Sequence, residues 1–156
     1  MARYNRWQNG SLIRAADSLT DDDRWKDRCA FFKSIAATFN HLYWADALQL
    51  ERIKGNERPH ETVIHSLTEP AVWTYFKARR AERDDEIATW ATGLRHADLA
   101  GDTSWYPPGG SIRIVKPTAL CAVQMFNHQT HHRGQIHAML TAAGTKPEAT
   151  DLPAMP

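Results

Sequence analysis

The sequence predicts an all-α fold, a four-helix bundle with a small β-hairpin between the third and fourth helices. Apolar residues recur every three or four positions in four long stretches, at about 2–18, 23–54, 70–94 and 117–143, and this period is typical of amphipathic helices. Residues 103–115 differ, because short alternating runs flank a Pro-Pro-Gly-Gly turn, a pattern typical of paired strands. Helices that each bury one face must pack together, which favours a bundle.

Signals at the ends of these stretches support the four helices. Thr20 and the three aspartates after it suit the positive start of the second helix, and Gly55 suits its end. Thr68 followed by Pro70 is a good opening for the third helix. Pro117 is expected to begin the fourth helix and Gly144 to end it.

The connections leave the order of the helices open. The link between the second and third helices contains His60 and His65 and is long enough to cross the length of a helix, so simple up-down-up-down order is not forced. Ile112 and Ile114 fall on one face of the hairpin, which should lie against the helices because an isolated hairpin is marginally stable. We expect one domain over 1–146 and a tail over 147–156.

Composition excludes several classes of protein. At 156 residues with a net charge of +1, the chain can bury a core but has no strong field to attract nucleic acid or an anionic membrane. Cys29 and Cys121 are far apart, which fits a reducing compartment. The first residues lack the apolar run of a signal peptide. These features predict a cytoplasmic protein without a nucleic-acid or membrane partner.

The fourth helix carries two histidines in the middle of an apolar stripe. On a helical period one face reads Cys121, Met125, His128, His132, Ile136, Met139 and Ala143. Residues four apart on a helix can reach one ion, and a buried imidazole without a partner is costly. His128 and His132 are therefore candidate metal ligands, the alternative being histidines that are hydrogen-bonded within the core. His131 is expected to support a ligand or lie at the surface, although it could replace His132, and His137 is expected to be solvated.

A third ligand is needed because two histidines make a weak metal site. His41 is the best candidate, since it lies in the middle of the second helix and its stripe neighbours Thr38 and Ala45 are small enough to leave space. His60, His65 and His96 fall in loops or at a helix end. Cys121 is seven residues from His128, about 10 Å along the helix axis, and is expected to be a packed thiol.

Three sequence blocks resemble the DinB-like (YfiT-like) family. They are residues 4–7 (Tyr-Asn-Arg-Trp), 40–46 (Asn-His-Leu-Tyr-Trp-Ala-Asp) and 126–135 (Phe-Asn-His-Gln-Thr-His-His-Arg-Gly-Gln), of which the last two are the specific ones. The resemblance implies a four-helix bundle of up-down-down-up order with His41, His128 and His132 around a divalent ion. It also implies frequent dimers and relatives that transfer low-molecular-weight thiols or isomerise substrates with a thiol cofactor.

Three neutral imidazoles would leave open positions on an ion such as Zn²⁺ or Ni²⁺. Such an ion can activate a thiol or a water molecule. We therefore expect a metal-dependent enzyme acting on a small molecule, with thiol S-transfer ahead of hydrolysis. A non-catalytic, metal-binding, dimeric stress-response protein is the alternative.

Other polar residues near these motifs have alternative roles. Asp46 and Gln135 could orient ligands, and Arg133 could meet an anionic substrate. Arg80 could clamp an anion, although an arginine on an apolar stripe more often places its head on a carboxylate or in solvent. Six tryptophans are more than a small core hides, so a homodimer is expected, with Trp7 of the first helix as a plausible contact.

Overall fold

The computed structural model describes residues 1–56, 66–107 and 110–156. In chain order the elements are α1 (Ala2–Asp17), α2 (Asp21–Trp25), α3 (Ile35–Lys54), α5 (Trp73–Gly93), the 3-10 helix η1 (His96–Leu99), β1 (Asp102–Trp105), β2 (Ile114–Pro117), α6 (Thr118–Ala142) and the 3-10 helix η2 (Leu152–Ala154). The chain is thus mostly helical with one small sheet, as predicted. His60 and His65 of the long connection, and Pro108 and Gly109 of the predicted turn, lie outside the described residues.

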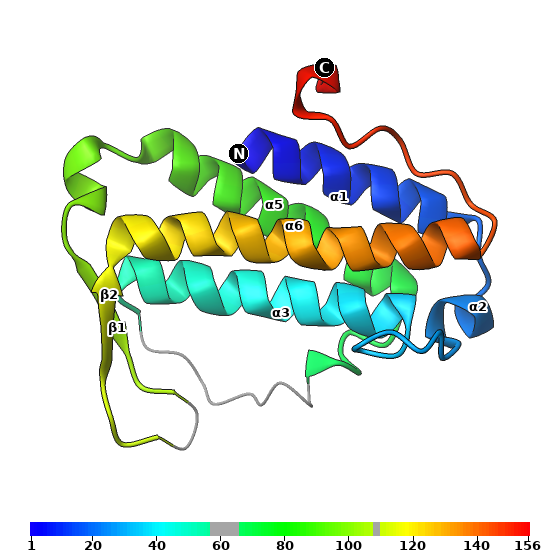
Figure 1. Ribbon diagram of the computed structural model, residues 1–156, viewed down its shortest axis with the longest axis horizontal. Coiled ribbons are helices and arrows are strands. Elements are labelled where there is room, and N and C mark those ends of the chain that lie inside the picture. Colours follow the sequence, from blue (N-terminus) through cyan, green and yellow to red (C-terminus); the bar gives the residue numbers. More distant parts are fainter. Residues whose placement is uncertain (57–65, 108–109) are drawn as a thin grey trace.

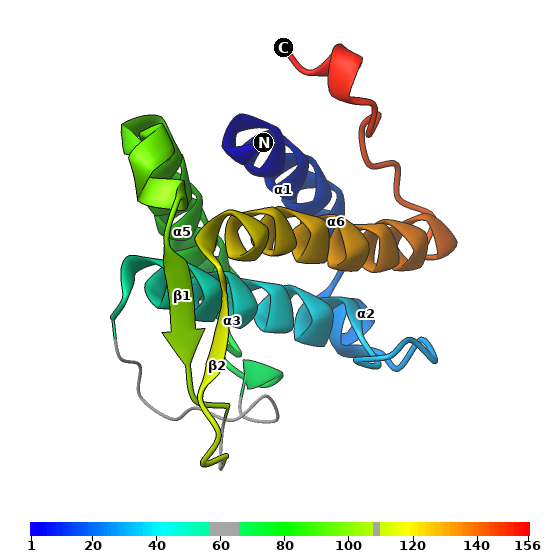
Figure 2. The same cartoon turned by 60° about the vertical axis from the view of Figure 1, so that its left-hand side comes forward.

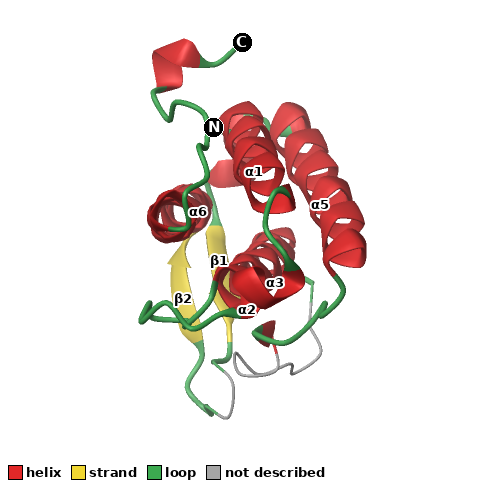
Figure 3. Ribbon diagram, turned by 90° about the vertical axis from the view of Figure 1, so that its right-hand side faces the viewer, coloured by secondary structure: helices red, strands yellow, loops and turns green. Residues whose placement is uncertain are grey.

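The four long helices share an interior. α1 and α6 run in one direction, and α3 and α5 run in the opposite one (Figure 1). α6 contacts α3 and α1, and α5 contacts the same two helices from the other side; Figure 3 shows this arrangement nearly end-on. The more specific prediction of a four-helix bundle stays a prediction. Among the described residues, none of the helices combines the length and apolar character needed to cross a membrane.

The second helix differs from its prediction, because residues 26–34 interrupt it. Thr20 accepts a hydrogen bond from the Asp23 N–H and caps α2, as expected, but α3 begins only after Ser34, whose hydroxyl accepts from the Ala37 N–H. Between them, Cys29 and Lys33 have positive φ angles of 57° and 67°, which a continuous helix cannot contain. This turn buries Phe32 and leaves Phe31 78% exposed.

The third helix begins at Trp73, three residues later than Pro70. The Ala71 N–H instead donates to the Glu69 carboxylate at 3.3 Å, so the backbone at Pro70 belongs to a local turn. At the other end of the chain, Gly144 follows α6 with a φ of 85°. That is the left-handed conformation expected of a glycine after a helix.

The hairpin is confirmed, but its second strand begins at Ile114 and ends at Pro117, later in the chain than predicted. β1 pairs antiparallel with β2 so that Thr103 lies opposite Lys116 and Trp105 opposite Ile114. Pro117 ends β2 and caps α6. β1 contacts α3 and α6, and β2 contacts α6 (Figure 2). The prediction that Ile112 lies on the packed face is wrong, because Ile112 precedes the strand and is 79% exposed.

A polar layer divides the core into two apolar clusters. The larger contains Leu12, Ala16, Ile35, Phe39, Leu42, Phe76, Ile136, Met139 and Leu140; the smaller contains Leu50, Ile87 and Met125. Between them along the helices lie Asp46 of α3, Arg80 and Asp84 of α5, and Arg133 of α6, all buried. Two of the candidate metal ligands lie near this layer, because His132 precedes Arg133 in α6 and His41 is five residues before Asp46 in α3.

The tail lies along α1. The Tyr4 hydroxyl donates to the Thr150 carbonyl at 2.6 Å, and the Trp7 indole N–H donates to Glu148 at 3.1 Å. The Glu148 N–H donates to the Ser11 hydroxyl at 2.9 Å. The face of α1 that carries Trp7 is therefore engaged by the chain's own C-terminal residues.

Candidate metal centre and its cavity

The structure brings His41 of α3 together with His128 and His132 of α6. One nitrogen of each imidazole lies within 4.8 Å of the other two. The ring centroids are 4.4 Å apart for His128 and His132, 4.7 Å for His41 and His132, and 5.4 Å for His41 and His128. The helical spacing of four residues places the two α6 imidazoles on one face, and the packing of α3 against α6 supplies the third.

Gln135 fixes the tautomer of His132. Its side-chain oxygen lies 2.8 Å from His132 Nδ1, and its amide nitrogen lies 3.3 Å from His131 Nε2. Because the amide oxygen can only accept, His132 Nδ1 carries the proton and donates it. The lone pair of His132 is therefore on Nε2, which faces His128 Nε2 at 3.1 Å.

Burial keeps the three imidazoles neutral. Loss of water, together with the smaller effect of neighbouring histidines, lowers the pKa of His41 to about 3 and that of His128 to about 4. The pKa of His132 is also lowered by burial, and the hydrogen bond to Gln135 opposes this change. Neutral imidazoles are the form that binds a metal.

These pKa values predict the pH dependence of metal binding. An ordinary imidazole with a pKa of 6.5 would lose affinity for an ion as the pH falls through that value, because protons compete with the ion. Here we expect zinc affinity to be retained to lower pH than with ordinary imidazoles, because all three pKa values are lowered, and to fall steeply as the pH approaches about 4, where His128 is protonated. Competition with a chromophoric chelator at several pH values measures this; a steady loss that begins at the ordinary histidine pKa would contradict it.

Aromatic rings form the wall around the histidines. The Phe32 ring centroid lies 4.1 Å from that of His41 and 5.5 Å from that of His132. The Trp44 ring lies 6.0 Å from that of His41. The interruption between α2 and α3 thus has a consequence for the site, because it places Phe32 against two of the three imidazoles.

The donor set fits a divalent ion. Tetrahedral ligands with Zn–N bonds of 2.0–2.1 Å hold their nitrogens about 3.3 Å apart. This is close to the 3.1 Å that separates Nε2 of His128 from Nε2 of His132. The buried Nδ1 atom of His41 has no hydrogen-bond partner among the described residues, and the lone pair on His132 Nε2 faces His128 Nε2. A cation between the three rings would bind one nitrogen of each imidazole.

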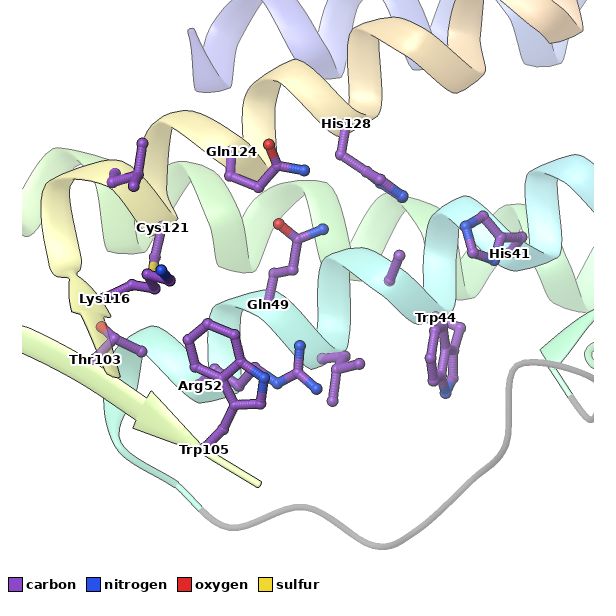
Figure 4. A pocket seen from close by; sticks show the side chains of 13 residues that line it. His41, Trp44, Gln49, Arg52, Thr103, Trp105, Lys116, Cys121, Gln124 and His128 are labelled. Carbon is purple, nitrogen blue, oxygen red and sulfur yellow. The ribbon is translucent and has the colours of Figure 1, made fainter. Parts of the chain in front are cut away.

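A cavity of about 550 Å³ opens beside His41 and His128. It extends along α3 and α6 toward the hairpin, and Figure 4 shows the side chains that line it. Near the histidines its wall is Trp44 and Ala45; farther along it is Gln49 and Gln124. The far end is formed by Arg52, Thr103, Trp105, Lys116 and Cys121. Any ion held by the histidines would therefore be reached from this cavity.

Asp46 and Arg80 lie in the buried polar layer, outside the lining of the cavity. Arg80 donates to Asp46 at 2.6 Å and to Asp84 at 2.8 Å, and Asn9 donates to the same Asp84 oxygen at 2.9 Å. Burial raises the pKa of Asp46 to about 6, against the effect of Arg80, so this carboxyl is ionised at neutral pH. Arg80 thus places its guanidinium on carboxylates, a placement that its sequence position favoured over an anion clamp.

Arg133 is also buried and faces away from the cavity. It donates to Asn5 of α1 at 2.7 Å, to Gln129 at 3.2 Å and to Thr130 at 3.1 Å. Its guanidinium lies 5.4 Å from the centre of the Tyr4 ring. An anionic substrate in the cavity would not meet this side chain. His131 is exposed and contacts Gln135 and the edge of the His132 ring.

Sequence reasoning missed the far end of the cavity. Arg52 comes from α3, Trp105 from β1 and Lys116 from β2, and no motif links these three positions. The signal that existed was the hairpin itself, since its apolar face had to lie on the helices.

One family model matches the chain. It is described as the DinB family and covers residues 1–156, the whole chain. No curated protein and no solved structure gives a match.

Proposed function

Because the chain belongs to the DinB family, we propose that it is a metal-dependent enzyme with His41, His128 and His132 as the ligands of one divalent ion, Zn²⁺ or Ni²⁺. The activity that we infer is S-transfer from a low-molecular-weight thiol to an electrophile. The scaffold is inferred to be a four-helix bundle of up-down-down-up order, in line with the helix directions and contacts.

One observation carries this proposal. Three neutral imidazoles converge within 4.8 Å, and two of them, His41 and His128, line a cavity large enough for a small organic substrate. A closed structural site would need a fourth protein ligand. Among the described residues, the group of histidine, cysteine and acidic side chains close enough to hold an ion contains the three histidines alone.

Each group around the metal site has a separate role in the proposed reaction. A bound divalent ion would supply Lewis acidity that favours the thiolate form of a thiol in the cavity. Gln135 holds His132 in the tautomer that presents Nε2. Phe32 and Trp44 restrict water around the histidines, which strengthens electrostatic interactions there.

The described lining of the cavity favours thiol chemistry over hydrolysis. No aspartate or glutamate is among the described residues that line the cavity, so none of these residues is a carboxylate placed to take a proton from water. A thiol has a pKa of about 8.5, against 15.7 for water, so its anion forms near neutral pH with much less stabilisation by a metal or a base. Hydrolysis stays the second candidate, because the same three-histidine arrangement can activate water.

Chelation and reconstitution test the proposal. Removal of the metal is expected to abolish transfer of a thiol such as glutathione to a chromogenic electrophile, and Zn²⁺ or Ni²⁺ should restore it. The helical circular dichroism should be largely retained, because two apolar clusters hold the helices together. Collapse of the helices on chelation would instead support a structural ion, whose binding energy is folding energy. Metal-dependent ester hydrolysis without thiol transfer would support the hydrolase.

We also propose a homodimer that acts in the cytoplasm, on the strength of the family resemblance and the cysteine usage. Its contact surface need not include Trp7, since Glu148 of the same chain holds that indole.

A further inference from the structure

The end of the cavity that is far from the histidines holds positive charge. Arg52 of α3 is half-buried there, and its guanidinium lies 4.9 Å from the centre of the Trp105 ring. Lys116 of β2 lines the same end. Figure 4 shows both at the opposite side of the cavity from His41 and His128, with Gln49 and Gln124 between.

Among the described residues, Arg52 has no carboxylate partner, unlike the neighbouring Lys54. Lys54, two residues later, pairs with Glu86 at 2.7 Å and with Glu51 at 3.7 Å. Arg52 and Lys116 make no ion pair with any described residue, and no acidic side chain is among the described residues of the cavity wall. Burial lowers the pKa of Arg52, as expected for a cation that has lost water without gaining a carboxylate.

The geometry of this end suits the recognition of an anion. The cation–π contact with Trp105 restrains the guanidinium, whose N–H groups can make two parallel hydrogen bonds to a carboxylate or a phosphate. An anion there would offset the burial of Arg52, which no carboxylate among the described residues compensates. Lys116 adds a second charge at the rim, where it is exposed.

Helix geometry gives the length of a molecule that would reach both ends. Cys121 is seven residues before His128 on α6, and Arg52 is eleven residues after His41 on α3. At a rise of 1.5 Å per residue these separations are roughly 10 and 16 Å along the helix axes. The walls between are partly apolar, through Ala45 and Leu48.

We propose that Arg52, stacked on Trp105 and assisted by Lys116, binds an anionic group at one end of an elongated substrate. The reacting end of that substrate lies at the histidines, roughly 10–16 Å away. The inference rests on the proposed function for the position of the reacting end. It adds that the substrate, or the thiol, carries a carboxylate or a phosphate on an extended, partly apolar body.

Matched probes test this inference. Mercaptooctanoate and mercaptooctanol share the thiol and the chain length and differ in the terminal charge. We expect the acid to bind the metal-loaded protein at least about tenfold more tightly than the alcohol, because a hydrogen bond to a charged group contributes about 1.5–3 kcal/mol. Binding is measured by calorimetry. It is also followed by tryptophan fluorescence, and the contribution of Trp105 is the difference between the unaltered protein and Trp105→Phe. Mercaptopropionate, which is too short to span the cavity, should show no benefit from its carboxylate.

Variants identify the residue responsible. Arg52→Met is expected to reduce the preference for the acid to about twofold or less, while mercaptooctanol binds as before. Lys54→Met, which removes a nearby cation outside the cavity wall, should leave the preference unchanged. Equal binding of acid and alcohol by the unaltered protein, or equal losses for both probes in Arg52→Met, would overturn the proposal. Circular dichroism confirms that each variant is folded.

A metal-free arm separates this proposal from the proposed function. Octanoate, octyl phosphate and octanol lack the thiol, and their relative binding to chelated protein reports the anion site alone. A preference for either anion that disappears in Arg52→Met supports the site even if no thiol chemistry is found, and the stronger anion identifies the substrate class. Loss of metal-dependent thiol binding with this preference intact would contradict only the proposed function.

Discussion

Replacement of His128 with alanine is expected to lower the affinity for Zn²⁺ or Ni²⁺ by more than about 100-fold. Loss of a residue that merely orients a ligand costs about 10–100-fold, and His128 supplies one of the three nitrogens within 4.8 Å. His41→Ala and His132→Ala should behave alike, because the remaining pair leaves a weak site. Metal content after matched purification and competition with a chromophoric chelator measure the effect, and thiol transfer should disappear with the metal.

Two histidines on the same helix are the controls. His137→Ala should retain one ion per chain, since His137 is outside the cluster. His131→Ala tests the alternative ligand. The His131 side chain contacts Gln135 and does not line the cavity, so a modest loss of metal affinity is expected. Unchanged metal content in both His128→Ala and His132→Ala would remove the central claim of the proposed function.

The histidine cluster could be anticipated because its determinants are local. His128 and His132 are one turn apart on an apolar stripe, and His41 is flanked by Thr38 and Ala45. Helical periodicity converts such spacing into a shared face. Their role as ligands stays a prediction, whereas their proximity is a property of the structure.

The interruption before α3 could not be anticipated from periodicity. Phe31 and Phe32 continue the apolar pattern of the helix that follows, and neither position with positive φ, Cys29 or Lys33, is a glycine or an asparagine. Ser34 was the available signal, because a serine before an apolar run is a common helix cap. Tertiary packing decides the rest, since Phe32 is buried against His41.

The far end of the cavity and the buried polar layer depend on contacts between distant segments. Arg52 and Trp105 are far apart in sequence and meet because β1 lies on α3. The sequence offered Arg133 as a contact for an anionic substrate, yet Asn5 from the opposite end of the chain accepts its hydrogen bond at 2.7 Å. A single sequence shows that such residues are polar, and the packing of the helices determines which of them are buried together.

Replacement of Arg80 with methionine is expected to destabilise the protein by about 3–5 kcal/mol, which is typical of removing one partner of a buried ion pair. Arg80 is 1% exposed and pairs with Asp46, 0% exposed, and with Asp84. Methionine fills much of the same volume, so the loss reports two carboxylates left in the interior without their cation. Urea unfolding measures the free energy of unfolding, and a decrease below about 1 kcal/mol would contradict a buried pair.

Arg79→Met is the matched control, because the side chain of the adjacent Arg79 is 43% exposed and pairs with Glu82 on the surface; a change within about 0.5 kcal/mol is expected. A second variant distinguishes lost packing from unpaired charge. In Arg80→Met combined with Asp46→Asn, one of the two carboxylates becomes neutral, so part of the stability should return.

Metal affinity should remain near that of the unaltered protein in the folded state, since Arg80 and Asp46 are outside the histidine cluster. A large loss of metal affinity in folded Arg80→Met would show that the polar layer also positions the histidines near it.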